Sequence, residues 1–238
     1  MYLHACASSL CEHTFDAGVL MVKQQHEFCD PVHAFVRADS DERTVIDSVP
    51  VQRLRHIHQL ATAYLVYPGA THRRFEHSLG TMELAGRVYD VVTSPSAMTG
   101  EVRELCPEAN DEQQRLYWRR VIRLAALCHD IGHLPFSHAA EKDLLPDGWD
   151  HERFSQELIL KRLDGQLGRM RPPVIAEDVA KIAVGPKKAK NVPYSPWERI
   201  LSEIIVGDAF GVDRMDYLLR DSLHAGVALW RLRPSPVD

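Results

Sequence analysis

Apolar residues recur every three or four positions along most of this chain, which is the spacing of one face of an α-helix. The clearest stripe consists of Leu79, Met82, Ala85, Val88 and Val92. It predicts a helix that ends before Pro95. An earlier, less regular segment over residues 46–65 carries Leu54, Ile57 and Leu60 at helical spacing, and the Pro68-Gly69 pair after it predicts a turn.

A third helix is predicted to begin near Asn110 or Asp111 and to end at Gly132. Its apolar stripe of Trp118, Ile122 and Ala125 runs directly into His129. We therefore expect this histidine to face the same interior as the apolar residues that precede it.

Two more helices are predicted near the end of the sequence. Ser195, Pro196 and Glu198 stand at the positions of a capping hydroxyl, a first-turn proline and a capping-box carboxylate, so a helix should begin there and end at Gly207. The other runs from about residue 212 to 224. One face of this helix carries a polar stripe of Asp213, Tyr217, Arg220 and His224. The opposite face carries an apolar stripe of Val212, Met215, Leu219 and Leu223.

The fold class that follows is all-α, because few runs alternate between apolar and polar residues as strands do. We expect a single helical domain over residues 29–228, preceded by an N-terminal extension of uncertain order over residues 1–28 and followed by a short tail over residues 229–238. Loops are expected at Pro146-Asp147-Gly148 and at the basic stretch of residues 187–190, which is more simply a solvated loop than a nucleic-acid contact.

The amino-acid composition limits the classes of protein to which this chain can belong. The 238 residues are 45% hydrophobic and 26% charged, with a formal net charge of -5, so binding to nucleic acid is not expected. Five sparse cysteines without a CxxC pair indicate free thiols, and no apolar run approaches the roughly 20 residues that span a bilayer. These features predict a cytoplasmic protein that does not bind membranes.

Histidines are concentrated after the third predicted helix. His129 and Asp130 are adjacent, and His133, His138 and His151 follow within two dozen positions. A single histidine on an apolar face is usually a hydrogen-bonded core residue, but this density favours a divalent-metal site, because imidazole and carboxylate together bind such ions well. Gly132 ends the helix, which would let two neighbouring residues face the same ion.

Two further ligands are needed for affinity and fixed geometry. His77 is one candidate, and Asp213, on the polar stripe of the last predicted helix, is the other. On periodicity alone that stripe would be a solvent-exposed face. Its tyrosine and arginine suit equally a phosphate-binding wall beside a metal, since a guanidinium can bind oxyanions with two hydrogen bonds.

Four extended motifs, over residues 49–55, 67–80, 128–138 and 213–221, together resemble the HD-domain superfamily of metal-dependent phosphohydrolases. Within that superfamily they are similar to the deoxynucleoside triphosphate triphosphohydrolases of the SAM-and-HD-domain type and their bacterial relatives. The resemblance covers about residues 30–226. It implies the HD-domain helical fold, with the metal site in its core.

The resemblance also implies roles for individual residues. One divalent ion, of Mn, Fe, Zn, Ni or Mg, is expected to bind the ligands His77, His129, Asp130 and Asp213. The expected substrate-binding residues are Arg74 at the phosphates, Gln59 and Leu60 at the sugar, and Tyr217, Arg214 and Asp221 around the pocket. The residues expected near the scissile phosphate are His133, Glu141, His138 and His151, of which the last two are our choice for proton transfer.

The implied function is hydrolysis of deoxynucleoside triphosphates to a deoxynucleoside and triphosphate. Two alternatives stay open: an HD phosphatase or phosphodiesterase for another nucleotide, and a catalytically silent nucleotide-binding module. Members of this branch usually have a C-terminal lobe, which is expected to be absent here, and a homo-oligomer (dimer or tetramer) is compatible with the resemblance. Asp47, Gln52 and Arg55 match a regulatory nucleotide site of some relatives, although helix packing or a salt bridge explains them as well.

Overall fold

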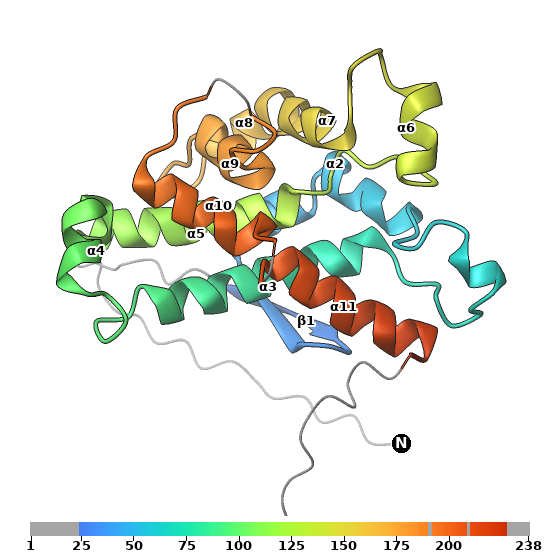
Figure 1. Ribbon diagram of the computed structural model, residues 1–238, viewed down its shortest axis with the longest axis horizontal. Helices are drawn as coiled ribbons and strands as arrows, with labels where there is room; N and C mark the ends of the chain where they lie inside the picture. The colour runs from blue at the N-terminus through green and yellow to red at the C-terminus, as the bar shows by residue number, and fades with distance from the viewer. Residues whose placement is uncertain (1–23, 190–191, 209, 228–238) are drawn as a thin grey trace, which may run out of the picture.

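The structure is a computed structural model that describes residues 24–189, 192–208 and 210–227 (Figure 1). Helices dominate it, as predicted. The sequence pattern did not reveal a small antiparallel hairpin, in which β1 (Gln25–Asp30) pairs with β2 (Ala34–Asp39). Most of the expected N-terminal extension and the whole expected C-terminal tail lie outside the described residues, while β1 begins within the region assigned to the extension.

The first half of the chain contains several short helices and one long one. They are α1 (Ser40–Ile46), α2 (Val49–Gln52), the 3-10 turns η1 (Arg53–His56) and η2 (Ala63–Leu65), and α3 (Arg74–Val92). The segment over residues 46–65 is thus not one regular helix. Leu54 and Ile57 are buried as their spacing suggested, but Ile57 already has an extended backbone.

The second half is almost entirely helical. Its elements are α4 (Gly100–Leu105), η3 (Pro107–Asn110), α5 (Glu112–Cys128), α6 (His138–Leu144), α7 (His151–Leu158), the π-turn η4 (Ile159–Leu163), α8 (Asp164–Leu167), α9 (Ala176–Val184), α10 (Pro196–Val206) and α11 (Val212–Ala225). Among the described residues, no helix is both long and apolar enough to cross a membrane.

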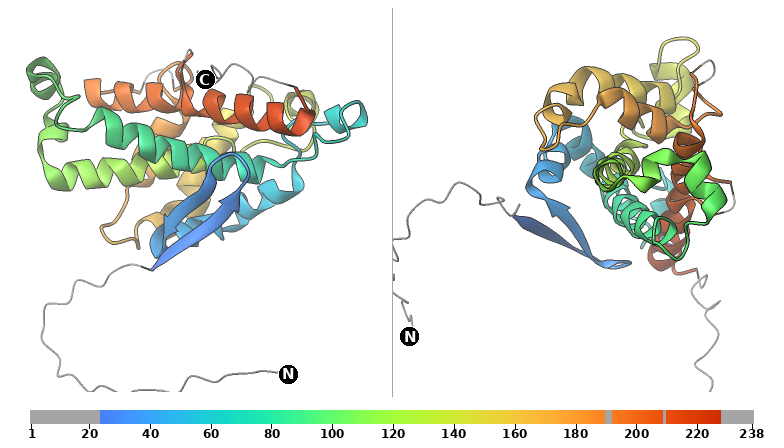
Figure 2. Two further views of the ribbon diagram at one scale, coloured as in Figure 1. Left: turned by 90° about the horizontal axis from the view of Figure 1, so that it is seen from below. Right: turned by 90° about the vertical axis from the view of Figure 1, so that its left-hand side faces the viewer.

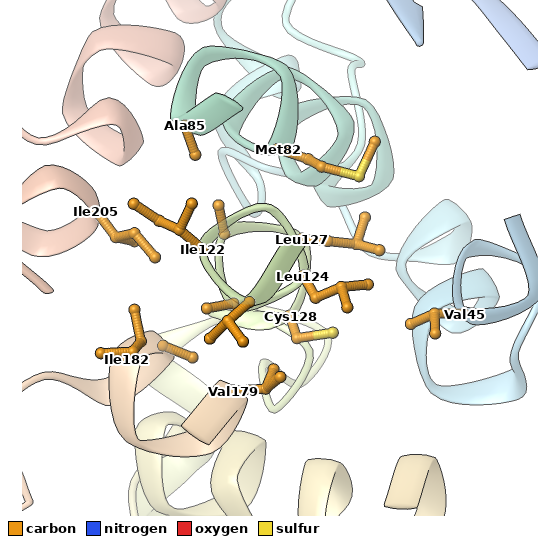
Figure 3. Close-up of a cluster of buried hydrophobic side chains, with 14 of the residues drawn as sticks. Val45, Met82, Ala85, Ile122, Leu124, Leu127, Cys128, Val179, Ile182 and Ile205 are labelled. Carbon is orange, nitrogen blue, oxygen red and sulfur yellow. The ribbon is translucent and has the colours of Figure 1, made fainter. Parts of the chain in front are cut away.

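Helix α5 is the centre of the core. Every residue from 121 to 128 is buried, and the helix is surrounded by α3, α1, α9 and α10 (Figures 2 and 3). Met82, Ile122 and Ile205 are among the side chains that meet there. The predicted interior stripe of this helix is confirmed, and α5 therefore carries its last residues into a position that packing has already fixed.

The predicted helix starts are also confirmed in detail. Asp111 caps α5, because its side chain accepts a hydrogen bond from Gln114 N at 2.8 Å. Ser195 and Glu198 form the expected reciprocal capping box at the start of α10. Gly148 has a φ of 75°, which fits the predicted turn before α7.

Helix α11 corrects the reading of its polar stripe as a solvent face. The helix packs against α3 and α10, yet its inward face carries Asp216 and Arg220, which are fully buried. Of its apolar stripe, Val212 is buried at the start of the helix, but Met215, Leu219 and Leu223 point outward and are 37–49% exposed. The residues of the polar stripe are thus buried or half-buried, and most of the apolar stripe faces outward, the reverse of what periodicity alone indicated.

Candidate metal centre

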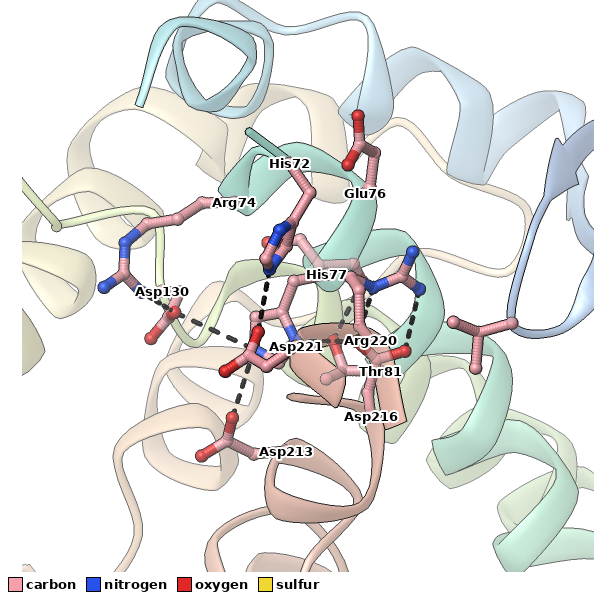
Figure 4. Close-up of polar contacts among 12 residues, drawn as sticks. His72, Arg74, Glu76, His77, Thr81, Asp130, Asp213, Asp216, Arg220 and Asp221 are labelled. Carbon is pink, nitrogen blue, oxygen red and sulfur yellow. Dashed lines mark hydrogen bonds and ion pairs between the residues drawn. The ribbon is translucent and has the colours of Figure 1, made fainter. Parts of the chain in front are cut away.

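Three helices converge on one small group of polar side chains, which we call the metal-ligand cluster: His77, His129, Asp130 and Asp213. His77 lies in the first turn of α3, and Asp213 lies in the first turn of α11. His129 and Asp130 follow directly after α5. Figure 4 shows Asp130, His77 and Asp213 close together at the junction of these helices. The convergence of the four expected ligands agrees with the sequence prediction.

The distances within the metal-ligand cluster fit a shared ion. His77 Nε2 lies 3.1 Å from Asp213 Oδ1, and His129 Nε2 lies 3.4 Å from the same oxygen. Asp130 Oδ1 is 3.4 Å from His129 Nε2, while Asp130 Oδ2 is 3.9 Å from His77 Nε2. Ligand atoms of His77, His129 and Asp213 all lie within 4.8 Å of one another.

The two imidazoles are also oriented as ligands should be. The Nε2 atoms of His77 and His129 are both buried and have no hydrogen-bond partner among the described residues. A buried polar atom without a partner is costly, so a group that fills this gap would stabilise the site. On the far side of each ring Nδ1 is engaged, in His129 by the Ala126 carbonyl oxygen at 2.7 Å. Neutral Nε2 atoms aimed at two carboxylates form a suitable donor set for a divalent cation.

The electrostatics of the metal-free cluster couple binding of a cation to release of protons. Burial opposes charge on His77, but the nearby carboxylates of Asp213 and Asp216 outweigh it and raise its pKa to about 10. Burial likewise opposes charge on His129, and Asp130 and Asp213 still raise its pKa. Burial opposes ionisation of Asp130, but His129 and Arg74 hold its pKa well below the ordinary value. The site thus holds two carboxylates whose charge is balanced by imidazolium until a cation replaces the protons.

Arg74, expected to contact phosphate, is paired with a ligand of the metal-ligand cluster. One Nη atom donates to Asp130 Oδ2, and the other donates to Ser137 Oγ at 2.8 Å. Its Nε atom is buried without a hydrogen-bond partner. Arg74 is therefore close enough to the ion site to contact a bound anion. Its guanidinium would do so while it is still paired with Asp130.

A second group, which we call the Glu141 cluster, consists of Glu141, His133, His138 and His151. Glu141 Oε1 accepts a hydrogen bond from His151 Nδ1 at 2.9 Å. The same oxygen lies 2.9 Å from His138 Nδ1 and 3.8 Å from His133 Nδ1. The rings of His133 and His151 stack with centroids 3.8 Å apart. All four residues expected near the scissile phosphate are thus brought together.

The Glu141 cluster touches the metal-ligand cluster through His133. Its Nε2 lies 3.5 Å from Asp130 Oδ1, and Asp130, His133 and His151 form another group whose ligand atoms are within 4.8 Å. Burial, together with Arg74, lowers the pKa of His133 to about 2 in spite of Asp130. Burial therefore favours the neutral form of His133 near neutral pH in the metal-free protein.

The turn that carries Asp130 to His133 is held from two sides. Ser155 Oγ donates to His129 O at 2.8 Å and accepts from Gly132 N at 2.8 Å. A Cβ atom on Gly132 would lie 2.1 Å from the carbonyl oxygen of His151, so α7 packs directly on this backbone. Arg53 holds the other side, because it donates to His133 O at 2.8 Å and to Ile131 O.

The residues expected at the sugar lie near the C-terminal half of α11. Asp221 Oδ1 accepts from His72 Nε2 at 2.7 Å, and the His72 ring stacks on His224 with centroids 4.5 Å apart. Gln59 N donates to His72 O at 3.1 Å, and Gln59 Oε1 is buried without a hydrogen-bond partner. The corner formed by Gln59, His72 and Asp221 thus offers polar groups for a ligand.

The other expected substrate residues differ in their exposure. Leu60 and Tyr217 are half-buried, and Arg214 is exposed. Tyr217 lies midway between Asp213 and Asp221 on one face of α11, since the three residues are spaced by four. Arg220, which the polar stripe suggested for phosphate binding, does not serve that purpose, because it is fully buried and paired with Asp216 and Asp30.

Sequence reasoning missed a layer of charged residues below His77. Asp216 and Arg220 on α11, Asp30 at the end of β1 and His33 in the hairpin turn form this layer, and all four are buried. A usable signal was present for Asp216, which follows the ligand Asp213 by three residues and so lies on the same helix face. No local pattern connects Asp30 or His33 to a helix that follows about 180 positions later.

The residues that match a regulatory site of some relatives make local contacts. Arg43 Nε pairs with Asp47 at 2.6 Å, and Arg55 Nε donates to Gln52 Oε1 at 2.8 Å. The Arg55 guanidinium also lies over the Phe75 ring, 3.6 Å from its centroid. Salt bridges and helix packing thus account for these side chains.

Comparisons with known proteins point to the same family. The model of the HD domain matches residues 74–220. The chain is 35% identical over 209 residues to the uncharacterized protein YwfO of Bacillus subtilis, covering 87% of this chain and 42% of that protein. It is 33% identical over 221 residues to the deoxynucleoside triphosphate triphosphohydrolase SAMHD1 of Gallus gallus, covering 84% and 34%.

A solved structure agrees with these sequence matches. A hypothetical protein from Aquifex aeolicus is 36% identical and superposes with a TM-score of 0.64, over 87% of this chain and 48% of that chain. The chain thus spans between about a third and a half of the length of these relatives. The family match contains all four members of the metal-ligand cluster, and the chain belongs to the HD domain family.

Proposed function

We propose that this protein is a metal-dependent phosphohydrolase that cleaves deoxynucleoside triphosphates into a deoxynucleoside and inorganic triphosphate. The observation that carries the proposal is the pair of buried Nε2 atoms of His77 and His129, which lack hydrogen-bond partners and face Asp213. The relatives named as deoxynucleoside triphosphate triphosphohydrolases support the substrate class.

Each group of residues has a part in this reaction. The metal-ligand cluster would hold one divalent cation, which when bound supplies Lewis-acid chemistry that activates water and stabilises charge on phosphate oxygens. Arg74 would contact phosphate beside Asp130, and the corner at Asp221 and Gln59 would orient the sugar. These contacts would place the α-phosphorus next to the site of water activation.

Proton transfer falls to the Glu141 cluster. Water adds to the α-phosphorus, the bond from that phosphorus to the 5′ oxygen breaks, and the departing oxygen takes up a proton. His138 has a 72% exposed side chain, and its Nδ1 lies 2.9 Å from Glu141 Oε1, so it can reach a substrate while the carboxylate attracts its ring. His151 shares the same carboxylate and can return the proton.

A second candidate is an HD phosphatase or phosphodiesterase that acts on a less charged phosphate ester. One observation favours it: Arg74, expected at the phosphates, and Arg220, the arginine of the polar stripe, are both already paired with carboxylates. A triphosphate needs more cationic contacts than a monophosphate does, so fewer free guanidinium groups suit a smaller ligand.

The test is a product analysis of the Mn²⁺-loaded protein with the four deoxynucleoside triphosphates, a nucleoside monophosphate and a phosphodiester. Triphosphate released in one piece supports the proposal, and orthophosphate alone supports the second candidate. Tight nucleotide binding without any product would identify a silent binding module. Asp130→Ala should abolish turnover, whereas Asp143→Asn on the exposed side of α6 is the matched control.

A further inference from the structure

A buried carboxylate lies directly behind the metal-ligand cluster. His77 Nδ1 donates to Asp216 Oδ2 at 2.8 Å, on the side of the ring that faces away from Asp213. Asp216 is fully buried on α11, one turn after Asp213. A carboxylate that accepts from Nδ1 fixes the tautomer of a histidine and leaves Nε2 free to bind an ion.

The two histidines of the metal-ligand cluster are therefore supported differently. His129 Nδ1 donates to a neutral backbone carbonyl, that of Ala126, at 2.7 Å. His77 Nδ1 donates to a charged side chain. A carboxylate raises the basicity of an imidazole ligand more than a carbonyl does, because it stabilises the positive charge that the ring gains on binding a cation.

Asp216 itself is held in place by two further side chains, one of which is anchored by a third. Arg220 binds it through two hydrogen bonds, Nε to Oδ2 at 2.8 Å and Nη2 to Oδ1 at 2.9 Å. His33 Nε2 donates to Asp216 Oδ1 at 2.6 Å, and Arg220 Nη1 also donates to Asp30 Oδ2 at 2.8 Å. The carboxylate thus has a partner on each oxygen besides His77, which fixes its rotamer.

Helix α3 leaves no room for Asp216 to move. A Cβ atom on Gly80 would lie 1.9 Å from Asp216 Oδ1 and 2.5 Å from Arg220 Nη2. Figure 4 shows Asp216 and Arg220 from α11 directly beside the part of α3 that carries His77. The glycine permits the close approach of the two helices that brings the carboxylate to His77.

We propose that Asp216 is a positioning residue that orients His77 and strengthens it as a metal ligand, with Arg220, His33 and Asp30 holding Asp216. The inference rests on the metal centre proposed above. A salt bridge that only stabilised the fold would leave metal affinity unchanged, whereas loss of a carboxylate behind a histidine ligand lowers metal affinity about 10- to 100-fold.

The test compares two substitutions on α11. Asp216→Asn keeps the size of the side chain and removes its charge. Asp221→Asn is the matched control, since Asp221 also accepts from a histidine, His72, at 2.7 Å, but that ring is not in the metal-ligand cluster. Mn²⁺ binding to the full-length protein is measured by the electron paramagnetic resonance signal of the free ion, and Co²⁺-loaded protein gives a visible absorption spectrum.

The expected result is a 10- to 100-fold weaker Mn²⁺ affinity and a shifted Co²⁺ spectrum for Asp216→Asn, with both unchanged for Asp221→Asn. Equal Mn²⁺ affinity and an identical Co²⁺ spectrum for wild type and Asp216→Asn would overturn the inference while leaving the metal centre intact. Failure of the wild-type protein to bind Mn²⁺ or Co²⁺ would overturn the metal centre and this inference with it.

A second variant tests the proposed role of Asp216 if Asp216→Asn does not fold. Gly80→Ala retains every ligand and every charge but pushes against Asp216 Oδ1. It should weaken Mn²⁺ binding and shift the Co²⁺ spectrum in the same direction, while circular dichroism of the metal-free protein stays that of a folded helical protein. A folded Gly80→Ala protein with wild-type Mn²⁺ affinity would contradict the proposed role of Asp216.

Discussion

The metal-ligand cluster and the Glu141 cluster are neighbours built on different supports. His77 and Asp213 lie in the first turns of long helices, and His129 follows the most deeply packed helix of the core. The Glu141 cluster depends on α6, a helix of seven residues, and on one carboxylate shared by three histidines. The metal-ligand cluster is thus fixed by the core, while the members of the Glu141 cluster are held mainly by one another.

The difference extends to exposure and backbone conformation. His77 is completely buried, whereas the side chain of His138 is 72% exposed. The loop before α6 has two consecutive residues with positive φ, Phe136 at 69° and Ser137 at 52°. A rigid ion site beside a more open, strained loop suits an enzyme that must keep its metal and admit its substrate.

Removal of a ligand from the core-supported cluster should have the largest effect. His129→Ala is expected to lose its Mn²⁺ and at least on the order of 10³-fold in kcat/KM, because both ion binding and charge stabilisation depend on the ligand. Metal content is measured by elemental analysis alongside activity. His56→Ala, on an exposed 3-10 turn, is the control. A full metal complement in His129→Ala would show that the ligand assignment is wrong.

Acid should weaken metal binding through the same cluster. The pKa of His77 is raised to about 10 in the metal-free protein, so near pH 7 a cation must displace a proton, and Mn²⁺ affinity should rise about tenfold per pH unit between pH 6.5 and 8.5. Titrations with Mn²⁺ at three pH values measure the slope. An affinity that does not change over this range would contradict the proton displacement.

The stability of the metal-free protein should depend on pH in the opposite direction to its Mn²⁺ affinity. A folded-state pKa above the unfolded value of about 6.5 means that protonated His77 stabilises the metal-free fold fully below that pH. This contribution is lost as the pH rises toward 10. Thermal unfolding of metal-free protein should therefore show a falling midpoint across this range, and His77→Gln should flatten the fall.

The Glu141 cluster should be separable from metal binding. Glu141→Gln removes the charge that orients His138 and His151, and kcat is expected to fall about 10²-fold with Mn²⁺ affinity within threefold of wild type. Steady-state kinetics and Mn²⁺ titration are measured on the same preparation, with Asp143→Asn as control. Loss of Mn²⁺ in Glu141→Gln would mean that the two clusters form one unit.

The smallest effect is expected from a substitution in the loop before α6, where two residues have positive φ. Phe136→Gly should stabilise the protein by about 0.5–1 kcal/mol, because glycine accepts a φ of 69° without steric cost and the phenylalanine side chain is largely exposed. Urea unfolding measures the change. Phe136→Ala removes the ring but keeps a Cβ atom, so it should not stabilise the protein and serves as the control.

The long helices could be predicted because the relevant signals are local. The stripe from Leu79 to Val92 and the caps at Asp111 and Ser195 depend only on neighbours in sequence. The ligand motifs were recognisable from a family resemblance. Which of these residues approach one another was implied by that resemblance and not by periodicity.

Two features of the fold could not be predicted from the spacing of apolar residues. The hairpin of β1 and β2 lacks a clean alternation of apolar and polar residues. The less exposed face of β1 includes the polar residues His26 and Asp30, while Cys29 and Phe35 are apolar at exposed positions. Helix α11 buries Asp216 and Arg220 because four charged or polar groups from distant segments satisfy one another there. Hydrophobicity along one helix carries no information about such partners.

The direct contact between Gly132 and the α7 backbone restricts which codons at position 132 can encode a functional protein. A single methyl group would collide with the His151 carbonyl oxygen and the Ser155 amide, and would push apart the two segments that bear His129 and His151. A saturation library selected for activity should therefore return only the parental residue at position 132. Exposed positions a few residues away, such as Lys142, should accept almost any replacement.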